Sequence, residues 1–237
     1  MNTFLFDLDG TLLPMDMKLF EILYFEGLTK MFSNIIDPKG LVSLIWASTK
    51  VMISNTENIT NEAVFMTDLG KRIGEDLTVY QEKFDKYYET EFHKVKESTR
   101  EVQCMKDSIY LLRTKGYKIV IATNPLFPKS AIHTRIRWAG FEPNEFDYVS
   151  TFETNHYCKP QIKYYQEVLK DINKSAEECI MVGNDVQEDL IVKTLGVKTY
   201  LITDNILHRT VEDIVTDYKG TYKDFYKFVL TLPDISG

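Results

Sequence analysis

The chain has little cysteine, no long apolar run and no excess of positive charge. Its 237 residues include only Cys104, Cys158 and Cys179, an odd number without metal-ligand spacing, so we expect reduced, mostly buried thiols and a cytoplasmic location. The net charge is −7, from 28 Lys and Arg against 35 Asp and Glu. Binding to nucleic acid requires clustered basic side chains that neutralise phosphates, and we therefore expect no nucleic-acid partner.

No membrane-spanning or targeting segment is evident either. The first ten residues lack a basic stretch, and Asp7 and Asp9 interrupt what would otherwise be an apolar run. The most apolar window, residues 40–53, is broken by Ser43 and Lys50 among others, well short of the ~18 apolar residues that span a bilayer. We therefore expect no secretion signal and no membrane partner.

What the sequence does contain is typical of a globular α/β protein. Hydrophobic residues make up 44% of the chain and charged residues 27%, which excludes a disordered chain. Short apolar runs alternate with stretches of helical length. The runs predicted as strands are 3–6, 118–122, 146–149, 179–182 and 197–202, and those predicted as helices are 106–115, 129–139, 160–171, 187–195 and 221–230. This alternation predicts a doubly wound parallel sheet covered by helices on both faces.

The segment 15–102 departs from this alternation, because it contains helical patterns and no clear strand. We interpret it as an all-helical domain inserted after the first strand, with the α/β core formed by 1–14 and 103–237. Within the insert, one helical face carries an aromatic stripe. The stripe consists of Tyr80, Phe84, Tyr87, Tyr88 and Phe92. Such a stripe usually packs in a core, and a ligand-binding aromatic box is the less common alternative.

Two acids stand at the end of the first predicted strand, in Asp7-Leu8-Asp9-Gly10-Thr11. Ligands of open α/β sheets bind outside the carboxyl ends of the strands. Two adjacent carboxylates repel each other, which favours either a bound cation or two unequal pKa values. The alternative is an ordinary Asp-Gly turn.

Three more strand or helix boundaries carry polar side chains that could meet the first pair. Thr123 and Asn124 follow the second strand, Lys159 precedes a helix, and Asp185 and Asp189 follow the strand 179–182. A hydroxyl, a backbone N–H and a lysine beside a helix start can hold a phosphate. Taken singly, each of these residues is more often a cap, a turn or a surface residue.

Together these residues resemble the motifs of the haloacid dehalogenase-like (HAD) hydrolase superfamily. The first motif corresponds to 7–11, the second to Thr123, the third to Lys159, and the fourth to Gly183-Asn184-Asp185 through Glu188-Asp189. The resemblance extends over the whole chain, because the helical insert lies where that superfamily places its C1-type cap. It implies a HAD-like Rossmannoid core with an inserted helical cap.

The resemblance also implies catalytic roles. Asp7 would be the nucleophile that forms an aspartyl-phosphate, and Asp9 would be the general acid and base. Lys159 would be catalytic and substrate-binding, screening the negative charge of Asp7 from that of the phosphate. Asp189 would orient Lys159 or a metal-bound water without itself contacting the substrate or the metal.

By the same resemblance, Mg²⁺ would be the cofactor. The Asp7 carboxylate, the Asp9 backbone carbonyl and the Asp185 carboxylate would hold it, with water and a phosphate oxygen completing the coordination. Thr123 and the Asn124 amide would bind the phosphoryl oxygens of the substrate.

Asp9 also narrows the reaction that the resemblance implies. Dehalogenases and phosphonate hydrolases of the superfamily lack an acid at this position, and P-type ATPases have a threonine there. We therefore expect a Mg²⁺-dependent phosphatase, a phosphoric monoester hydrolase that acts on a small phosphorylated metabolite. A sugar phosphomutase on the same core, or a non-catalytic binding protein, remains open as an alternative. We further expect a monomer or weak homodimer whose cap closes over the site about hinges near 12–16 and 98–104.

Overall fold

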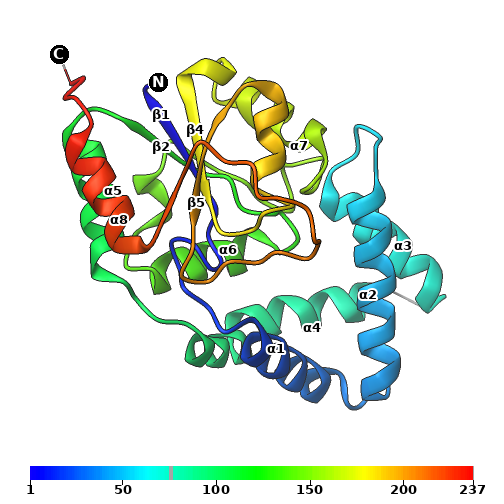
Figure 1. Cartoon of the computed structure of the whole chain (residues 1–237). Coiled ribbons are helices and arrows are strands. Elements are labelled where there is room, and N and C mark those ends of the chain that lie inside the picture. The colour runs from blue at the N-terminus through cyan, green and yellow to red at the C-terminus, as the bar shows by residue number, and fades with distance from the viewer. Residues whose placement is uncertain (75–76, 237) are drawn as a thin grey trace.

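The computed structural model describes residues 1–74 and 77–236, and a sheet of parallel strands runs through its centre (Figure 1). The strand order is β3-β2-β1-β4-β5-β6, and each neighbouring pair is parallel. The strands are β1 (Thr3–Phe6), β2 (Lys118–Ile121), β3 (Tyr148–Val149), β4 (Cys179–Gly183), β5 (Lys198–Ile202) and β6 (Tyr218–Gly220). The carboxyl ends of β1 and β4 therefore lie side by side in the middle of the sheet.

Both faces of this sheet are buried, as its nearly continuous apolar strands predict. Phe4 and Phe6 point to one face, where the ring of Phe6 lies 5.7 Å from that of Phe225. Leu5 points to the other face and packs in the same cluster as Tyr165. The first face is packed by α5 (Gln103–Thr114), α6 (Lys129–Trp138) and α8 (Tyr222–Thr231), and the second by α7 (Ile162–Asp171) and η4 (Leu190–Leu195). The predicted doubly wound α/β fold is confirmed.

Between β1 and α5, the secondary-structure elements of the described residues are all helices, joined by turns and loops. The helices are α1 (Met17–Phe32), α2 (Pro38–Ser54), α3 (Asn61–Ile73), α4 (Leu77–Glu89) and the 3₁₀ segment η1 (Glu91–Ser98). Three of them begin at side-chain caps, since Asp16, Asp37 and Thr60 accept backbone N–H groups of α1, α2 and α3. Residues 75 and 76 of the predicted insert lie outside the described residues. Figure 1 shows these helices gathered to one side of the sheet, which agrees with an inserted cap.

The predicted aromatic stripe lies largely in the interior of the helical insert. Tyr87 and Phe92 are fully buried, and the hydroxyl of Tyr88 lies 2.9 Å from that of Tyr24 on α1. The Phe92 ring stacks on Trp138 of α6 at 5.3 Å, which joins the insert to the core. Aromatic stacking of this kind adds to simple area burial. The stripe is therefore mainly packing, as expected.

The two chain segments that connect the insert to the core run antiparallel to each other. Met15 and Thr99 form an isolated bridge, in which Asp16 N–H donates to the Ser98 carbonyl at 2.9 Å and Arg100 N–H to the Pro14 carbonyl at 3.1 Å. The insert thus enters and leaves the core at one place.

Three details differ from the sequence-based expectation. The predicted helix at 187–195 is a series of turns followed by η4, because the Asp185 side chain accepts the backbone N–H groups of Gln187 and Glu188, both at 3.0 Å. Helix α7 begins at Ile162 rather than at Pro160, since a turn closed by Gln161 N–H and the Cys158 carbonyl precedes it. The short edge strand β6 carries no apolar pattern and was not predicted.

Two shorter 3₁₀ segments complete the described chain, η2 (Pro143–Glu145) and η3 (Ala176–Glu178). Within 1–74 and 77–236, we find no helix with the length and apolar character needed to cross a bilayer.

Candidate active site

The acids at the ends of β1 and β4 meet because the two strands pair in register. Phe6 pairs with Val182, and Asp7 N–H donates to the Val182 carbonyl at 2.9 Å. After Asp7 the chain turns sharply at Gly10, whose φ of +88° suits glycine. A Cβ on Gly10 would lie 2.4 Å from the Asn184 side chain, so the turn and the β4 loop fit only without it.

Lys159 lies between two of the predicted aspartates. Its Nζ is 3.0 Å from Asp7 Oδ1 and 2.6 Å from Asp189 Oδ1, and only 1% of the residue is exposed. Asp189 approaches this closely because Gly183 leaves space, since a Cβ there would lie 2.1 Å from Asp189 Oδ2. A buried lysine is tolerated only with such partners.

Burial controls the protonation of this cluster. Burial raises the pKa of Asp7 to about 6, against the opposing effect of the Lys159 charge. Burial likewise raises the pKa of Asp189 to about 7, again opposed by Lys159. For Lys159, burial lowers the pKa, but Asp189 and Asp7 raise it more, so its pKa lies well above the usual value. Lys159 therefore keeps its positive charge beside Asp7.

Asp9 has a partner that the sequence analysis did not identify, Arg135 on α6. Arg135 Nη1 forms a short ion pair with Asp9 Oδ2, and the Arg135 guanidinium lies 4.5 Å from the centre of the Phe127 ring. Burial raises the pKa of Asp9, while Arg135 lowers it. Two atoms of the pair, Arg135 Nη2 and Asp9 Oδ1, are buried and have no hydrogen-bond partner among the described residues. A sequence signal existed, because Arg135 shares the apolar face of α6 with Ala131 and Ile132.

Asp185 also has an unforeseen partner, Arg209, which lies in the loop after β5. The Arg209 guanidinium reaches both carboxylate oxygens of Asp185, at 2.8 and 2.6 Å. The hydrogen bond to Asp185 raises the pKa of Arg209. No periodic pattern surrounds Arg209 in the sequence, so no local signal predicts this contact.

The Thr123-Asn124 segment lies against the Lys159 loop. Asn124 Oδ1 accepts the Lys159 backbone N–H at 3.1 Å, and Asn124 Nδ2 donates to Glu188 at 3.0 Å. The Thr123 carbonyl accepts the Tyr164 hydroxyl at 2.8 Å, and Thr123 itself is buried. The structure thus brings the predicted residues from four chain segments to one edge of the sheet.

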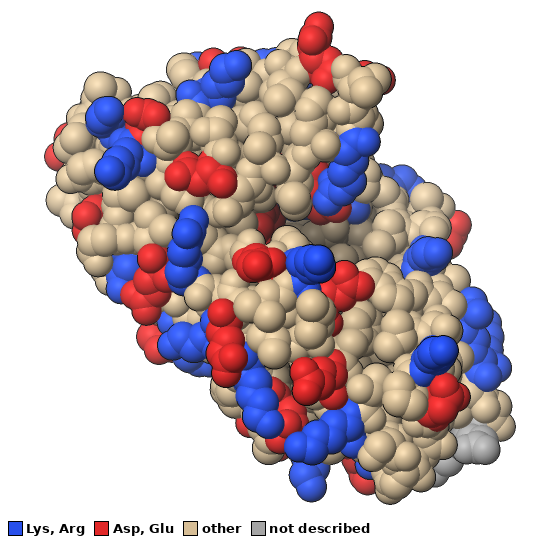
Figure 2. Space-filling model, turned by 60° about the horizontal axis from the view of Figure 1, so that its bottom comes forward, with Lys and Arg blue, Asp and Glu red and all other residues tan. Residues whose placement is uncertain are grey.

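A large cavity opens beside these residues. It measures about 960 Å³, and its walls come from α1, α2, α3 and α4 of the insert and from the core loops around Phe127 and Phe152. Asp9 and Arg135 belong to its lining, which connects the cavity to the strand ends. Figure 2 shows a hollow between the two parts of the molecule, with acidic and basic side chains around it. The hollow has room for an organic group next to the acids.

The oxygen donors at the strand ends fit a hard divalent cation. Asp7 and Asp185 offer carboxylates from neighbouring strand ends, and Asp9 offers a backbone carbonyl. Across the residues that the structure describes, no group of three or more His, Cys, Asp or Glu side chains could hold a metal ion. Two carboxylates and one carbonyl still suit Mg²⁺, because it retains several waters and is bound by one or two protein carboxylates.

Comparison with known proteins identifies the family. A family model described as a haloacid dehalogenase-like hydrolase matches residues 1–192. The chain belongs to this family. The resemblance to the HAD superfamily that the sequence motifs indicated is thereby confirmed. The chain is also similar, over most of its length, to pyrophosphatase PpaX of Bacillus mycoides. That match is 23% identical over 202 residues and covers 85% of this chain and 83% of the relative.

Solved structures agree on the fold. A HAD phosphatase from Thermococcus onnurineus superposes with a TM-score of 0.63 at 20% identity, covering 99% of this chain and 100% of that one. The HAD hydrolase YfnB of Bacillus subtilis, described as magnesium-bound with interdomain movement, superposes with a TM-score of 0.58 at 21% identity over 96% and 98% of the two chains. The HAD-like core with a helical insert is therefore shared with these proteins.

Proposed function

We propose that this HAD-like hydrolase is a Mg²⁺-dependent phosphatase that cleaves monoesters of small phosphorylated metabolites through an aspartyl-phosphate. The observation that carries the proposal is the buried lysine, Lys159, held between Asp7 and Asp189 while Asp9 stands two residues further along the chain. A carboxylate nucleophile and a dianionic phosphate repel each other by ~4 kcal/mol per pair of unit charges at ~4 Å and an effective dielectric constant of ~20. A permanently charged lysine beside the nucleophile offsets this repulsion.

Each residue has a definite part in this reaction. The Asp7 carboxylate attacks phosphorus and forms the P–O bond of the aspartyl-phosphate, while the bond to the leaving oxygen breaks. Asp9 gives its proton to that oxygen, and then removes one from the water that hydrolyses the intermediate. Thr123 and the Asn124 N–H orient the phosphoryl oxygens, and Asp189 orients Lys159.

For the metal, we propose Asp7, Asp185 and the Asp9 carbonyl as ligands. The bound cation would neutralise charge on the phosphoryl group. The Arg209 guanidinium forms an ion pair with the Asp185 carboxylate in the structure. Binding of the metal would require Arg209 to share or release that carboxylate.

We also propose the domain division 1–14 plus 103–237 for the core and 15–102 for the cap. The paired connections at Met15 and Thr99 support these boundaries, because the chain enters and leaves the insert side by side at this joint. Cap closure about this joint would exclude bulk water from the aspartyl-phosphate. The free state of all three cysteines supports a reducing cytoplasm, and we propose a monomer or weak homodimer.

The test is a hydrolysis assay on para-nitrophenyl phosphate and a panel of phosphorylated metabolites, with Mg²⁺. Phosphate release by the wild type, and none by Asp9→Asn on esters with poor leaving groups, is the expected result. Inorganic pyrophosphate belongs in the panel because of the similarity to PpaX. If pyrophosphate were cleaved and every monoester were not, the proposed monoesterase would be wrong.

A further inference from the structure

The cavity wall carries several aromatic side chains. They include Phe20, Phe25, Trp46, Phe65, Phe84 and Phe127, which come from all four insert helices and one core loop. Trp46 is 45% exposed, an unusual setting for the largest apolar side chain. The face of an aromatic ring has a negative electrostatic potential and attracts organic cations, quaternary ammonium groups above all.

The charged groups of the cavity wall are predominantly carboxylates. Apart from Asp9, the acidic residues are Glu21, Glu62, Glu82, Asp85 and Glu153, and the basic ones are Lys18 and Arg135. Within residues 1–74 and 77–236, none of these five carboxylates takes part in an ion pair, and Arg135 is engaged by Asp9. The described chain therefore leaves these five carboxylates without a cationic partner, although Glu153 accepts the Lys129 backbone N–H at 2.8 and 3.0 Å.

Three of these carboxylates face a common space from different elements. Burial, followed by the charges of Glu153 and Asp85, raises the pKa of Glu62. Glu62 lies in the first turn of α3, Asp85 lies on α4, and Glu153 comes from the core loop after β3. Groups from three segments that repel one another in this way would gain from a shared positive ligand.

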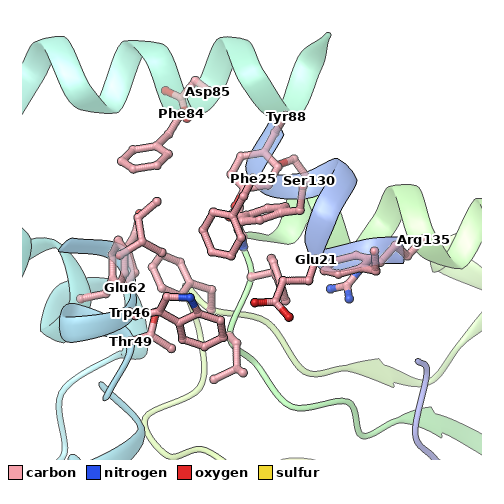
Figure 3. A pocket seen from close by; sticks show the side chains of 18 of the residues that line it. Glu21, Phe25, Trp46, Thr49, Glu62, Phe84, Asp85, Tyr88, Ser130 and Arg135 are labelled. Carbon is pink, nitrogen blue, oxygen red and sulfur yellow. The ribbon is translucent and has the colours of Figure 1, made fainter. Parts of the chain in front are cut away.

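The opposite end of the cavity has a different polarity. Arg135 is 1% exposed. Its Nη2 and Asp9 Oδ1 are buried at the cavity wall, and neither atom has a hydrogen-bond partner in the part of the chain that the structure describes. Figure 3 shows Arg135 on one side of the cavity and Glu62 and Asp85 on the other, with the rings of Phe25 and Tyr88 between them. A ligand that satisfies both ends carries polar oxygen near Asp9, an apolar body, and a positive group beyond it.

We infer that the cavity selects phosphate monoesters whose alcohol bears an amine or alkylammonium group at its far end. This inference rests on the proposed phosphatase function and adds the substrate class. The phosphate and ester oxygen would lie at Asp7, Asp9 and Arg135, and the cation among the aromatic rings and the carboxylates of Glu62 and Asp85. Anionic alcohols would meet unpaired negative charge and be disfavoured.

The test compares isosteres that differ only in charge. We would measure kcat/KM for trimethylammonio-alkyl phosphates with spacers of increasing length against their uncharged tert-butyl counterparts, with para-nitrophenyl phosphate and a hexose phosphate alongside. The cationic ester is expected to be preferred by at least about fivefold at the best spacer length, with the preference declining as salt is added.

Variants assign this preference to the cavity. The double variant Glu62→Gln/Asp85→Asn should remove most of it and leave kcat/KM for the tert-butyl esters within about twofold of wild type. Glu89→Gln is the matched control, because Glu89 is an exposed acid of α4 that does not line the cavity. If the tert-butyl ester or the hexose phosphate were preferred while para-nitrophenyl phosphate was cleaved, the substrate class would be wrong and the phosphatase proposal would stand.

A binding measurement separates the two proposals if no ester is cleaved. Calorimetry would compare choline with 3,3-dimethylbutan-1-ol, its uncharged isostere, on the wild type and on the double variant. Tighter binding of choline by the wild type alone would support the cationic site even though the phosphatase proposal had failed. Equal binding of the two alcohols would overturn the inference.

Discussion

The strand-end site and the cavity beside it differ in whether their carboxylates form ion pairs. Asp7, Asp9, Asp185 and Asp189 are each paired with a lysine or arginine, and these pairs are largely buried except that the Arg209 side chain on Asp185 is 53% exposed. Apart from Asp9, the carboxylates of the cavity wall form no ion pair within the described chain and are mostly open to solvent. Buried pairs are rigid, and removing one member leaves an uncompensated charge. Exposed, unpaired carboxylates cost the fold little and remain available to a ligand. We therefore expect changes at the strand ends to affect rate and stability, and changes in the cavity to affect substrate choice.

The largest effect is expected from Asp7→Asn. An amide cannot form the aspartyl-phosphate, so kcat should fall by at least about four orders of magnitude, since each tenfold corresponds to ~1.36 kcal/mol. Lys159 keeps Asp189 as a partner in this variant, so the fold should remain. Phosphate release and a thermal melt by circular dichroism would be measured together. A folded variant that retains a tenth of wild-type kcat would contradict the assignment of the nucleophile.

Metal removal should have nearly as large an effect. Dialysis against EDTA should abolish turnover, and Mg²⁺ should restore it, because Asp7 and Asp185 offer hard oxygen ligands. Ca²⁺ should not restore turnover, since it is larger and takes both oxygens of a carboxylate readily. Full activity after exhaustive chelation would exclude the proposed cofactor.

Lys159→Met should destabilise the protein as well as slow the reaction. Asp7 and Asp189 lose their shared cation, at a cost of about 3 kcal/mol in the free energy of unfolding. Because burial already raises their pKa values to about 6 and about 7, losing Lys159 raises them further. Raised carboxyl pKa values reduce stability as pH rises, so the loss should be greater at about pH 8 than at about pH 5.

Urea unfolding at both pH values would measure this loss. Lys170→Met is the control, because Lys170 is exposed in the last turn of α7 and should change stability by at most about 0.5 kcal/mol. A loss independent of pH would argue against the coupling to Asp7 and Asp189.

A more moderate effect is expected at Arg135, which acts by positioning Asp9. In Arg135→Gln, kcat should fall by about tenfold, less than the ~10²–10⁴-fold that general acid–base catalysis contributes, because Asp9 itself remains. Burial raises the pKa of Asp9 and Arg135 lowers it, so removing the arginine should move the Asp9 limb of the kcat–pH profile to higher pH. Arg137→Gln, on the exposed side of the same helix, should leave the profile in place. An unshifted limb in Arg135→Gln would leave Arg135 with a packing role alone.

The smallest effect on the fold is expected in the cavity wall. Trp46→Ala should lower the free energy of unfolding by about 1 kcal/mol or less, because nearly half of the side chain is already exposed. KM for an ester with a bulky organic group should rise severalfold, whereas acetyl phosphate should be used as before. A loss of several kcal/mol would show that Trp46 is a core residue, and that the cavity wall contributes to stability as the strand-end site does.

Much of the sheet could be predicted from the chain alone. Short apolar runs alternate with helical stretches, so the positions where the runs end, at Asp7, Thr123 and Asp185, had to meet along one edge of a parallel sheet. Lys159 could be added only through the resemblance to the family, since a lysine before a helix is unremarkable. The roles of these residues are still predictions.

Other features depend on contacts between distant segments. Arg135 and Asp9 are 126 residues apart, and Arg209 and Asp185 are joined across a loop with no repeating pattern. The expected helix at 187–195 became turns because Asp185 bonds to the following amides, a competition that periodicity does not reveal.

The sequence by itself determined the α/β alternation, the helical insert and the acids at the strand ends, because hydrophobic periodicity and chain order are local properties. Only the tertiary structure decided which arginines neutralise Asp9 and Asp185, and which carboxylates remain unpaired. The cavity is likewise a tertiary property, since its walls come from four helices and two core loops that meet only after the insert packs on the core through Phe92 and Trp138. The ion pairs and the cavity depend on distances between residues in space, and the spacing of residues along the chain does not specify these distances.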